Sequence, residues 1–255
     1  MMSVRSSFGR SFALAALTVV VSAAGADAQQ LPPAQQIVDK YVEAIGGRAA
    51  VARHKQRRVV TEMTMPAMGL TMTADLLTAS PNKMLLKMDA PGMGNMSSGY
   101  DGTVAWSNNP MQGPRVLDGP ELQEAIRQSD FESGLDYAKS YRMETIGEMA
   151  VGGRPCWNVK MTHITTGLEM QNCFDKENAL LVRTSMKSQS AMGEMQVDVT
   201  MSDYKDFDGI KMPTRSVTSM GGQEMTSVIK SVSHAPIDPS VFAPPAEVRA
   251  LRPQN

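Results

Sequence analysis

Methionine is unusually abundant among the side chains of this sequence that could take part in chemistry. The 255 residues include 22 methionines, two cysteines and three histidines. His54, His163 and His234 are far apart, and no cysteine or carboxylate accompanies them at the spacing of a zinc site. The sequence also lacks Gly-x-Ser-x-Gly, Ser-x-x-Lys, a phosphate-binding loop and His-Glu-x-x-His. We therefore expect a protein that is not an enzyme and needs no cofactor.

The methionines allow two interpretations. Many are two residues apart in segments typical of β-strands, where a flexible thioether side chain would line a soft apolar cavity. Thioethers are also soft ligands for Cu(I), so a copper or silver site is the alternative. That site would use methionines in or next to glycine-containing turns, namely Met68, Met93, Met96 and Met192. Composition alone does not decide between the two.

The two cysteines predict a disulfide bond. If Cys156 lies opposite Cys173 in an antiparallel hairpin, the residue numbers of every opposed pair in that register add up to 329. One face of the hairpin then carries the cysteines with the pairs Asn158–Gln171 and Lys160–Glu169, and the other face is apolar. Directly opposed residues are close enough for a disulfide, which we expect to form in an oxidising compartment.

The first 28 residues have the pattern of a secretory signal peptide. Arg5 and Arg10 precede an apolar run, and Ala26-Asp27-Ala28 supplies a cleavage site near Ala28. We expect the mature chain to be exported to the periplasm. No later stretch is long and apolar enough for a transmembrane span. The mature net charge of −2 argues against nucleic acid as a partner.

The elements that must position these side chains are mainly strands. Ala34 to Ala44 has helical periodicity, and a second helix begins near Pro120. Elsewhere the apolar residues alternate, with turn signals between them, as at Asp101-Gly102 and Asp208-Gly209. We expect a mainly β, α+β fold: a curved antiparallel half-barrel of about 10–11 strands closed by two helices. Residues 29–245 would form a single domain, and residues 246–255 an irregular tail.

The apolar faces of the strands would meet on the concave side of this half-barrel. There we expect the ligand-binding residues Met63, Met65, Met72, Leu76, Met84, Leu86, Met88, Trp106, Met195 and Met201.

Several turn and strand-start motifs resemble those of exported proteins grouped as outer-membrane lipoprotein-sorting-like, of the LolA/LolB type. They are Val38-Asp39-Lys40-Tyr41 with Gly46-Gly47, Tyr100-Asp101-Gly102 with Trp106, Asn109-Pro110-Met111 with Gly113-Pro114-Arg115, Phe174-Asp175-Lys176 with Leu180-Leu181-Val182-Arg183, and Asp203-Tyr204 with Phe207-Asp208-Gly209. The resemblance implies a curved half-barrel whose concavity receives acyl chains. Ala179 occupies a turn position where related sequences often have glycine, so we expect Asn178 to take the left-handed conformation there.

Three functions remain open at this point. The first is a periplasmic carrier or binding protein for a lipid, a lipoprotein acyl chain or another apolar ligand. The second is a methionine-rich protein that binds Cu(I) or Ag(I). The third is a non-enzymatic structural partner of other envelope proteins.

Overall fold

The structure, a computed structural model, describes residues 31–92, 94–132, 135–190 and 193–251. The expected leader, Met93 and Met192 therefore lie outside the described residues. The helices of the described part of the chain are all too short or too polar to span a bilayer.

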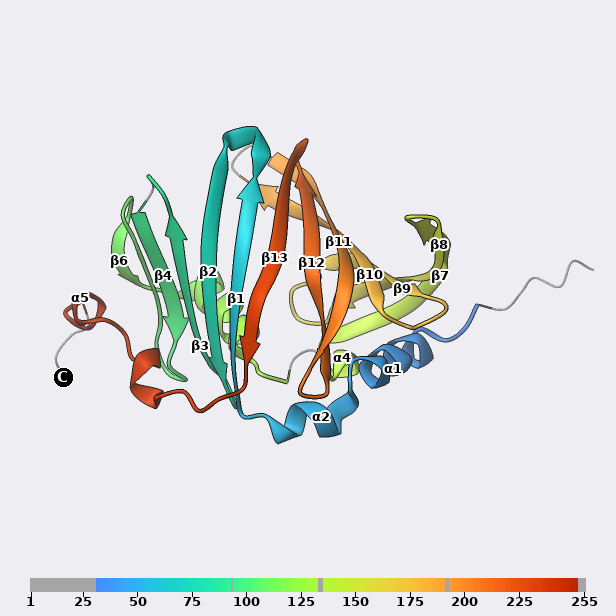
Figure 1. The fold of residues 1–255 in the computed structure, drawn as a ribbon, viewed down its shortest axis with the longest axis horizontal. Coiled ribbons are helices and arrows are strands. Elements are labelled where there is room, and N and C mark those ends of the chain that lie inside the picture. The colour runs from blue at the N-terminus through green and yellow to red at the C-terminus, as the bar shows by residue number, and fades with distance from the viewer. Residues whose placement is uncertain (1–30, 93, 133–134, 191–192, 252–255) are drawn as a thin grey trace, which may run out of the picture. The chain divides into compact units, whose positions relative to one another are not determined.

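The described strands form one open antiparallel sheet of thirteen strands, in the order β6-β5-β4-β3-β2-β1-β13-β12-β11-β10-β9-β8-β7 (Figure 1). They are β1 Gln56–Met65, β2 Leu70–Ala79, β3 Lys83–Ala90, β4 Gly94–Tyr100, β5 Ala105–Asn109, β6 Gly113–Val116, β7 Tyr141–Val151, β8 Arg154–His163, β9 Glu169–Asp175, β10 Leu181–Ser190, β11 Gly193–Phe207, β12 Ile210–Met220 and β13 Gln223–Ser233. The chain builds outward from β1 to one edge, crosses to the other edge at β7 and returns to β13 beside β1.

Five α-helices and two 3₁₀ turns accompany the sheet: α1 Ala34–Ala44, α2 Gly47–Arg53, α3 Gly119–Ser129, α4 Tyr137–Ser140, α5 Ala246–Arg249, η1 Pro66–Met68 and η2 Pro239–Phe242. The curved antiparallel sheet with helices agrees with the predicted fold class, but both counts were too low. Strand β6 was missed because it is a four-residue edge strand containing Pro114, a residue typical of edges and not of central strands. Helices α2, α4 and α5 are too short to show a clear helical period.

Helices α1 and α3 pack on the same face of the sheet, which we call the helix-side face. Ile37 and Val38 of α1 are buried against Val159 and Met161 of β8. Ala125 of α3 packs with Tyr100 and Ala105 on β4 and β5. The opposite face is called the outer face.

The C-terminal segment covers part of the outer face, which differs from the irregular tail expected at residues 246–255. Figure 1 shows it running from β13 to α5 beside β6. Phe242 of η2 and Val248 of α5 are almost fully buried in a cluster with Leu77, Leu85 and Trp106. Burial of these apolar side chains orders a segment whose prolines alone suggested irregular structure.

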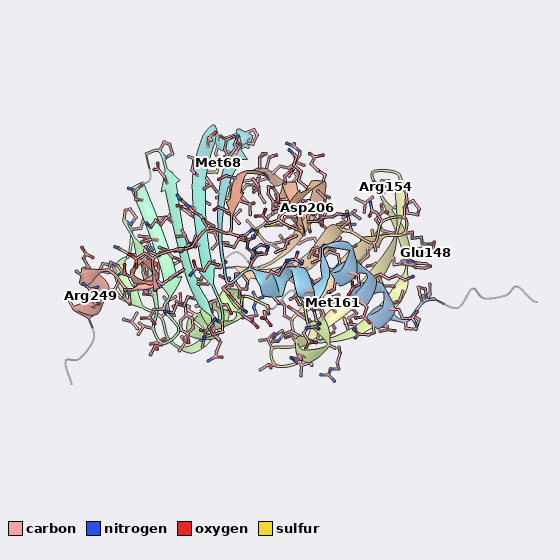
Figure 2. All side chains as sticks on the ribbon, turned by 60° about the horizontal axis from the view of Figure 1, so that its bottom comes forward. Met68, Glu148, Arg154, Met161, Asp206 and Arg249 are labelled. Atoms are coloured by element: carbon pink, nitrogen blue, oxygen red, sulfur yellow. A yellow bond between two sulfur atoms is a disulfide. The ribbon has the colours of Figure 1, made fainter. Side chains whose placement is uncertain are left out.

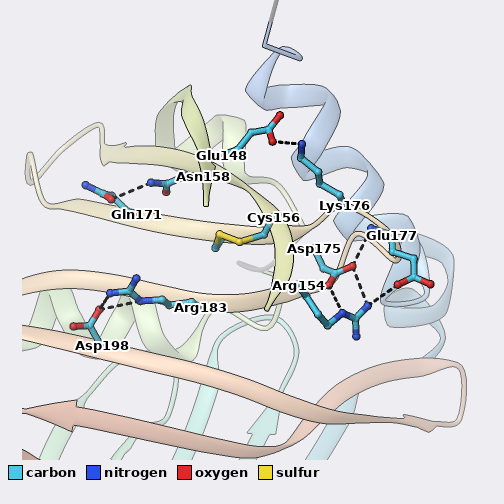
Figure 3. The surroundings of a disulfide bond; sticks show 11 residues. Glu148, Arg154, Cys156, Asn158, Gln171, Asp175, Lys176, Glu177, Arg183 and Asp198 are labelled. Atoms are coloured by element: carbon cyan, nitrogen blue, oxygen red, sulfur yellow. Dashed lines mark hydrogen bonds and ion pairs between the residues drawn. A yellow bond between two sulfur atoms is a disulfide. The ribbon is translucent and has the colours of Figure 1, made fainter. Parts of the chain in front are cut away.

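The expected disulfide joins Cys156 to Cys173 on the outer face of hairpin β8–β9, with Cα atoms 5.5 Å apart (Figure 3). The predicted register was wrong by two residues, because Cys173 lies opposite Asn158 and the paired numbers sum to 331. A slip of two residues leaves every side chain on its own face, so sorting by polarity does not detect it.

The turn of this hairpin explains the register. Gly167 has the left-handed φ of 70°, and the His163 N–H donates to Leu168 O at 2.8 Å. Pairing therefore starts at residues 163 and 168, whereas the predicted register would place Gly167 in an extended strand. The predicted polar pairs nevertheless form as diagonal contacts, with 3.2 Å between Asn158 Nδ2 and Gln171 Oε1 and 2.7 Å between Lys160 Nζ and Glu169 Oε1.

The turn between β9 and β10 also differs from the prediction. Ala179, and not Asn178, has the left-handed conformation, with φ of 61°. Asn178 instead accepts a hydrogen bond at Oδ1 from the Leu180 N–H at 3.0 Å, while its own N–H donates to Asp175 Oδ1 at 3.1 Å. These two bonds fix Asn178 in the turn and leave the left-handed position to Ala179.

Candidate functional site

Methionines from neighbouring strands lie directly opposite one another in the sheet. Met63 on β1 pairs with Met72 on β2, and Met88 on β3 pairs with Met96 on β4. A row of four crosses four consecutive strands, β7 to β10: Met143, Met161, Met170 and Met186. Directly opposed residues point to the same side of a sheet, so each group shares one face.

That face is the helix-side face, because Met161 is fully buried in the cluster that contains α1 (Figure 2). Opposed residues show that the same face continues across the middle of the sheet, through the pairs Met201–Ser216, Ser216–Ser227 and Ser227–Met63. Alternation along β1, β2, β3 and β11 then places nine of the ten predicted ligand-binding residues there: Met63, Met65, Met72, Leu76, Met84, Leu86, Met88, Met195 and Met201.

Trp106 is the exception. It pairs with Val116 on β6 and packs on the outer face with Leu77, Leu85 and Phe242. Its indole Nε1 is buried without a hydrogen-bond partner. The prediction placed Trp106 with the methionines because an isolated aromatic after a turn does not reveal which face it takes, and the C-terminal segment that covers it is distant in sequence.

Burial varies along this methionine-rich face. Met72 and Met84 are 8% and 7% exposed, whereas Met63, Met65, Met88, Met195 and Met201 are only half-buried. Met72 and Met84 therefore belong to the core. The half-buried methionines leave apolar, deformable side chains in contact with solvent.

Within the described part of the chain, helix α3 lines two cavities on this face. The first, of about 390 Å³, lies between α3 and strands β3–β5 and is mostly apolar, with Met84, Trp106, Leu117 and Ala125 in its wall. The second, of about 240 Å³, lies over strands β7–β10 and is lined by Arg127 of α3, residues of α4 and polar side chains of the sheet. We call the second cavity the polar pocket.

Asn172 of β9 is the buried amide of the polar pocket. It is 3% exposed, and its Oδ1 accepts a hydrogen bond from Thr184 Oγ1 at 2.8 Å. Its Nδ2 donates to the Met161 sulfur at 3.2 Å and reaches the Met170 sulfur at 3.8 Å. Thioether sulfur is a weak acceptor, so this amide lacks a strong hydrogen-bond partner on its nitrogen.

Arg127 and His163 add further hydrogen-bond donors to the polar pocket. Glu124 binds Nε and Nη2 of Arg127, with 2.8 Å from Nε to Glu124 Oε2, and Arg127 also makes a side-chain hydrogen bond with Tyr141. His163 Nδ1 accepts from the Thr166 N–H at 3.2 Å, so the neutral ring carries its proton on Nε2. The hydrogen bonds between Arg127 and Glu124 lower the pKa of Glu124.

A tyrosine cluster closes the pocket on the side of α1 and α4. The ring of Tyr137 lies 6.3 Å from that of Tyr41 and 6.1 Å from that of Tyr141. Burial raises the pKa of both Tyr41 and Tyr137 above the ordinary value of 10. Their hydroxyl groups therefore stay protonated at neutral pH and serve as hydrogen-bonding groups.

One residue of this pocket, Asn172, could have been recognised in the sequence, although the alternation of apolar residues did not identify it. Asn172 occupies a position between Met170 and Phe174 in the alternation that otherwise marks the dry face of β9. A polar residue in such a position needs an internal partner or a ligand. Arg127 gave no comparable signal, because an arginine near the end of an amphipathic helix is usually exposed.

The residues proposed for a copper site do not all come together in one described element. Met68 is 58% exposed in η1 at the end of hairpin β1–β2 (Figure 2), whereas Met96 is half-buried opposite Met88. Within the described ranges, no cluster of three or more histidine, cysteine, aspartate or glutamate side chains could hold a metal ion.

Comparison with known proteins identifies the fold. No family model matches the sequence, and no curated protein does. Solved structures do match. A LolA superfamily protein from Nitrosomonas europaea is 13% identical with a TM-score of 0.56, covering 84% of this chain and 98% of that one. A DUF1329 family protein from Desulfovibrio piger is 15% identical with a TM-score of 0.58, over 84% and 98%. The chain has a LolA-like fold, as its turn motifs predicted.

Proposed function

We propose that this chain is a non-enzymatic periplasmic binding protein or carrier, which holds an apolar molecule such as a lipid or a lipoprotein acyl chain on the helix-side face. The observation that carries the proposal is the set of half-buried methionines at the centre of that face, including Met63, Met88 and Met201. A bound acyl chain would remove their remaining apolar surface from water, and flexible thioethers adapt to a chain without fixed shape.

The cavity between α3 and strands β3–β5 supports the same proposal. Its size of about 390 Å³ lies within the range of roughly 300–1,000 Å³ typical of ligand pockets. Its wall is mostly apolar, and the predicted ligand residues Met84 and Trp106 form part of it. The LolA-like fold adds an expectation of ligand binding by analogy only, because one fold serves many functions.

Native mass spectrometry of the protein purified from the periplasm tests this proposal, before and after addition of Cu(I). Co-purifying lipid supports it. Stoichiometric Cu(I) without any lipid would replace it with the metal-binding alternative, whose candidate ligands are Met68, Met93, Met96 and Met192.

A pair of variants tests the site itself. Met63→Gln places an amide on the proposed surface, while Met111→Gln makes the same change at a turn residue that is 90% exposed. We expect Met63→Gln to weaken binding of a fluorescent long-chain probe by about tenfold, as one hydrogen-bonding group left without a partner costs about 1.4 kcal/mol. Met111→Gln should bind as the unmodified protein does. Equal affinities for the two variants would exclude Met63 from the site.

A further inference from the structure

The polar pocket contains a buried hydrogen-bond donor, the side-chain amide of Asn172, that has only weak acceptors. Asn172 Nδ2 has one hydrogen directed to the Met161 sulfur at 3.2 Å, and its other sulfur contact, to Met170, is 3.8 Å long. Arg127, by contrast, is held by Glu124 and by a side-chain hydrogen bond with Tyr141. His163 Nε2 carries the ring proton, because Nδ1 accepts from Thr166. A group that satisfies these donors must offer oxygen lone pairs.

The charge of the pocket adds a second constraint. Glu124 balances the positive charge of Arg127, so the pocket does not require a full negative charge from a ligand. The acceptor that fits is a carbonyl oxygen, which occurs in both a carboxylate and an acyl ester. A pure hydrocarbon would bury the donor of Asn172 without replacing its weak sulfur contacts by a stronger bond.

The size and position of the pocket suggest that it holds one end of a ligand. Its volume of about 240 Å³ is below the roughly 300 Å³ at which pockets begin to enclose a whole ligand. Met170 and Leu181 line it together with the polar groups, and Met201 packs against the same cluster as Leu181. The pocket thus borders the methionine-rich face, where an apolar chain would lie.

On the basis of the function proposed above, we infer that the ligand is an acyl compound, whose carbonyl group is bound in the polar pocket by Asn172 and whose chain lies along the methionines. The site thereby selects acyl chains over hydrocarbons of equal length. Arg127 distinguishes the two sources of a carbonyl, because its positive charge would strengthen binding of a carboxylate more than of an ester.

Binding of three matched compounds to the delipidated mature protein tests this inference: a long-chain fatty acid, its methyl ester and the alkane of the same length. We expect the acid and the ester to bind at least about tenfold more tightly than the alkane, the change given by one good hydrogen bond. Asn172→Leu, which is similar in volume, should reduce this preference to less than about threefold. Asn158→Leu is the matched control, since it changes an amide on the outer face of the same hairpin.

Each outcome separates the two proposals. If none of the three compounds binds, the proposed function fails. If all three bind with equal affinity, apolar binding stands and the acyl inference is overturned. If Arg127→Gln weakens binding of the acid more than binding of the ester, Arg127 acts on a carboxylate; an equal effect on both would overturn its role in distinguishing the two sources.

A measurement on the unmodified protein covers the case in which Asn172→Leu does not fold. The side-chain amide resonances of Asn172 in ¹⁵N-correlated NMR spectra should shift on titration with the acid or the ester and stay in place with the alkane. Shifts of equal size with all three compounds would contradict a hydrogen bond to the carbonyl.

Discussion

Removal of the disulfide should cost about 3 kcal/mol of unfolding free energy. Cys156 and Cys173 are separated by 17 positions, and closing a loop of that size in the unfolded chain corresponds to about 3 kcal/mol by the chain-entropy estimate. For a domain of this length, the same change lowers the melting temperature by roughly 6–12 °C. Both sulfur atoms are buried, so substitution by alanine adds a packing loss to the loss of the cross-link.

Three samples separate these two contributions: the oxidised protein, the same protein equilibrated with a reducing agent in urea, and the double variant Cys156→Ala/Cys173→Ala. We expect the reduced protein to lose about 3 kcal/mol and the double variant to lose more, because it also lacks the two buried sulfur atoms. The reducing agent should leave the double variant unchanged, which controls for effects unrelated to the bond.

The result that would refute this reasoning is a loss below about 1 kcal/mol in the reduced protein. In that case the hairpin must already hold residues 156 and 173 close together in the unfolded state, or the contacts around it must compensate. The ion pair of Arg154 with Asp175, 2.9 Å from Nε to Oδ2, lies beside the disulfide and is the first such contact to test (Figure 3).

Three further predictions concern the turn, the C-terminal segment and acid stability. Ala179→Gly should raise the free energy of unfolding by about 0.5–1 kcal/mol, measured in urea, because it relieves a left-handed alanine; a loss of stability would contradict this. Phe242→Ala should cost about 3–5 kcal/mol, since the side chain is 1% exposed, and a loss below about 1 kcal/mol would mean that the segment is dispensable. Because the pKa of Glu124 is lowered, first by its hydrogen bonds with Arg127, the stabilisation from this pair is complete above the ordinary pKa of 4.5 and disappears as the pH falls through the lowered value. Glu124→Gln should therefore make the melting temperature fall less as the pH is lowered below 4.5. An unchanged dependence of the melting temperature on pH would exclude the Glu124–Arg127 pair as a source of acid sensitivity.

The sequence predicted the features that depend on neighbouring residues. Alternation at Met63, Met65 and Met72 gave strands with one apolar face, and the end of helix α1 followed from Gly46 and Gly47. These signals are local, because a strand displays its two faces within a few residues. The cysteine pairing was also accessible, since it needed only that two polarity patterns match across one turn.

Features that depend on distant segments or on a single backbone angle were not predictable in this way. The outer-face position of Trp106 depends on Phe242 and Val248, more than 130 residues further along the chain. The two-residue error in the cysteine hairpin arose because Gly167 takes a positive φ, whereas polarity repeats every two residues and allows either register. Local patterns thus identify faces, while register and the covering segments need the folded chain.

The position of helix α3 connects the fold to the proposed selectivity. This helix is inserted between the two halves of the sheet, β1–β6 and β7–β13, and it lines both the apolar cavity and the polar pocket. Its residues Ala125 and Arg127 lie two positions apart, so they point to different sides of the helix. Ala125 faces the apolar cavity and Arg127 the polar pocket. A ligand with one polar and one apolar end would match both sides of α3 at once. A uniformly apolar ligand would match only one, and for this reason the acyl and alkane comparison tests the architecture as well as Asn172.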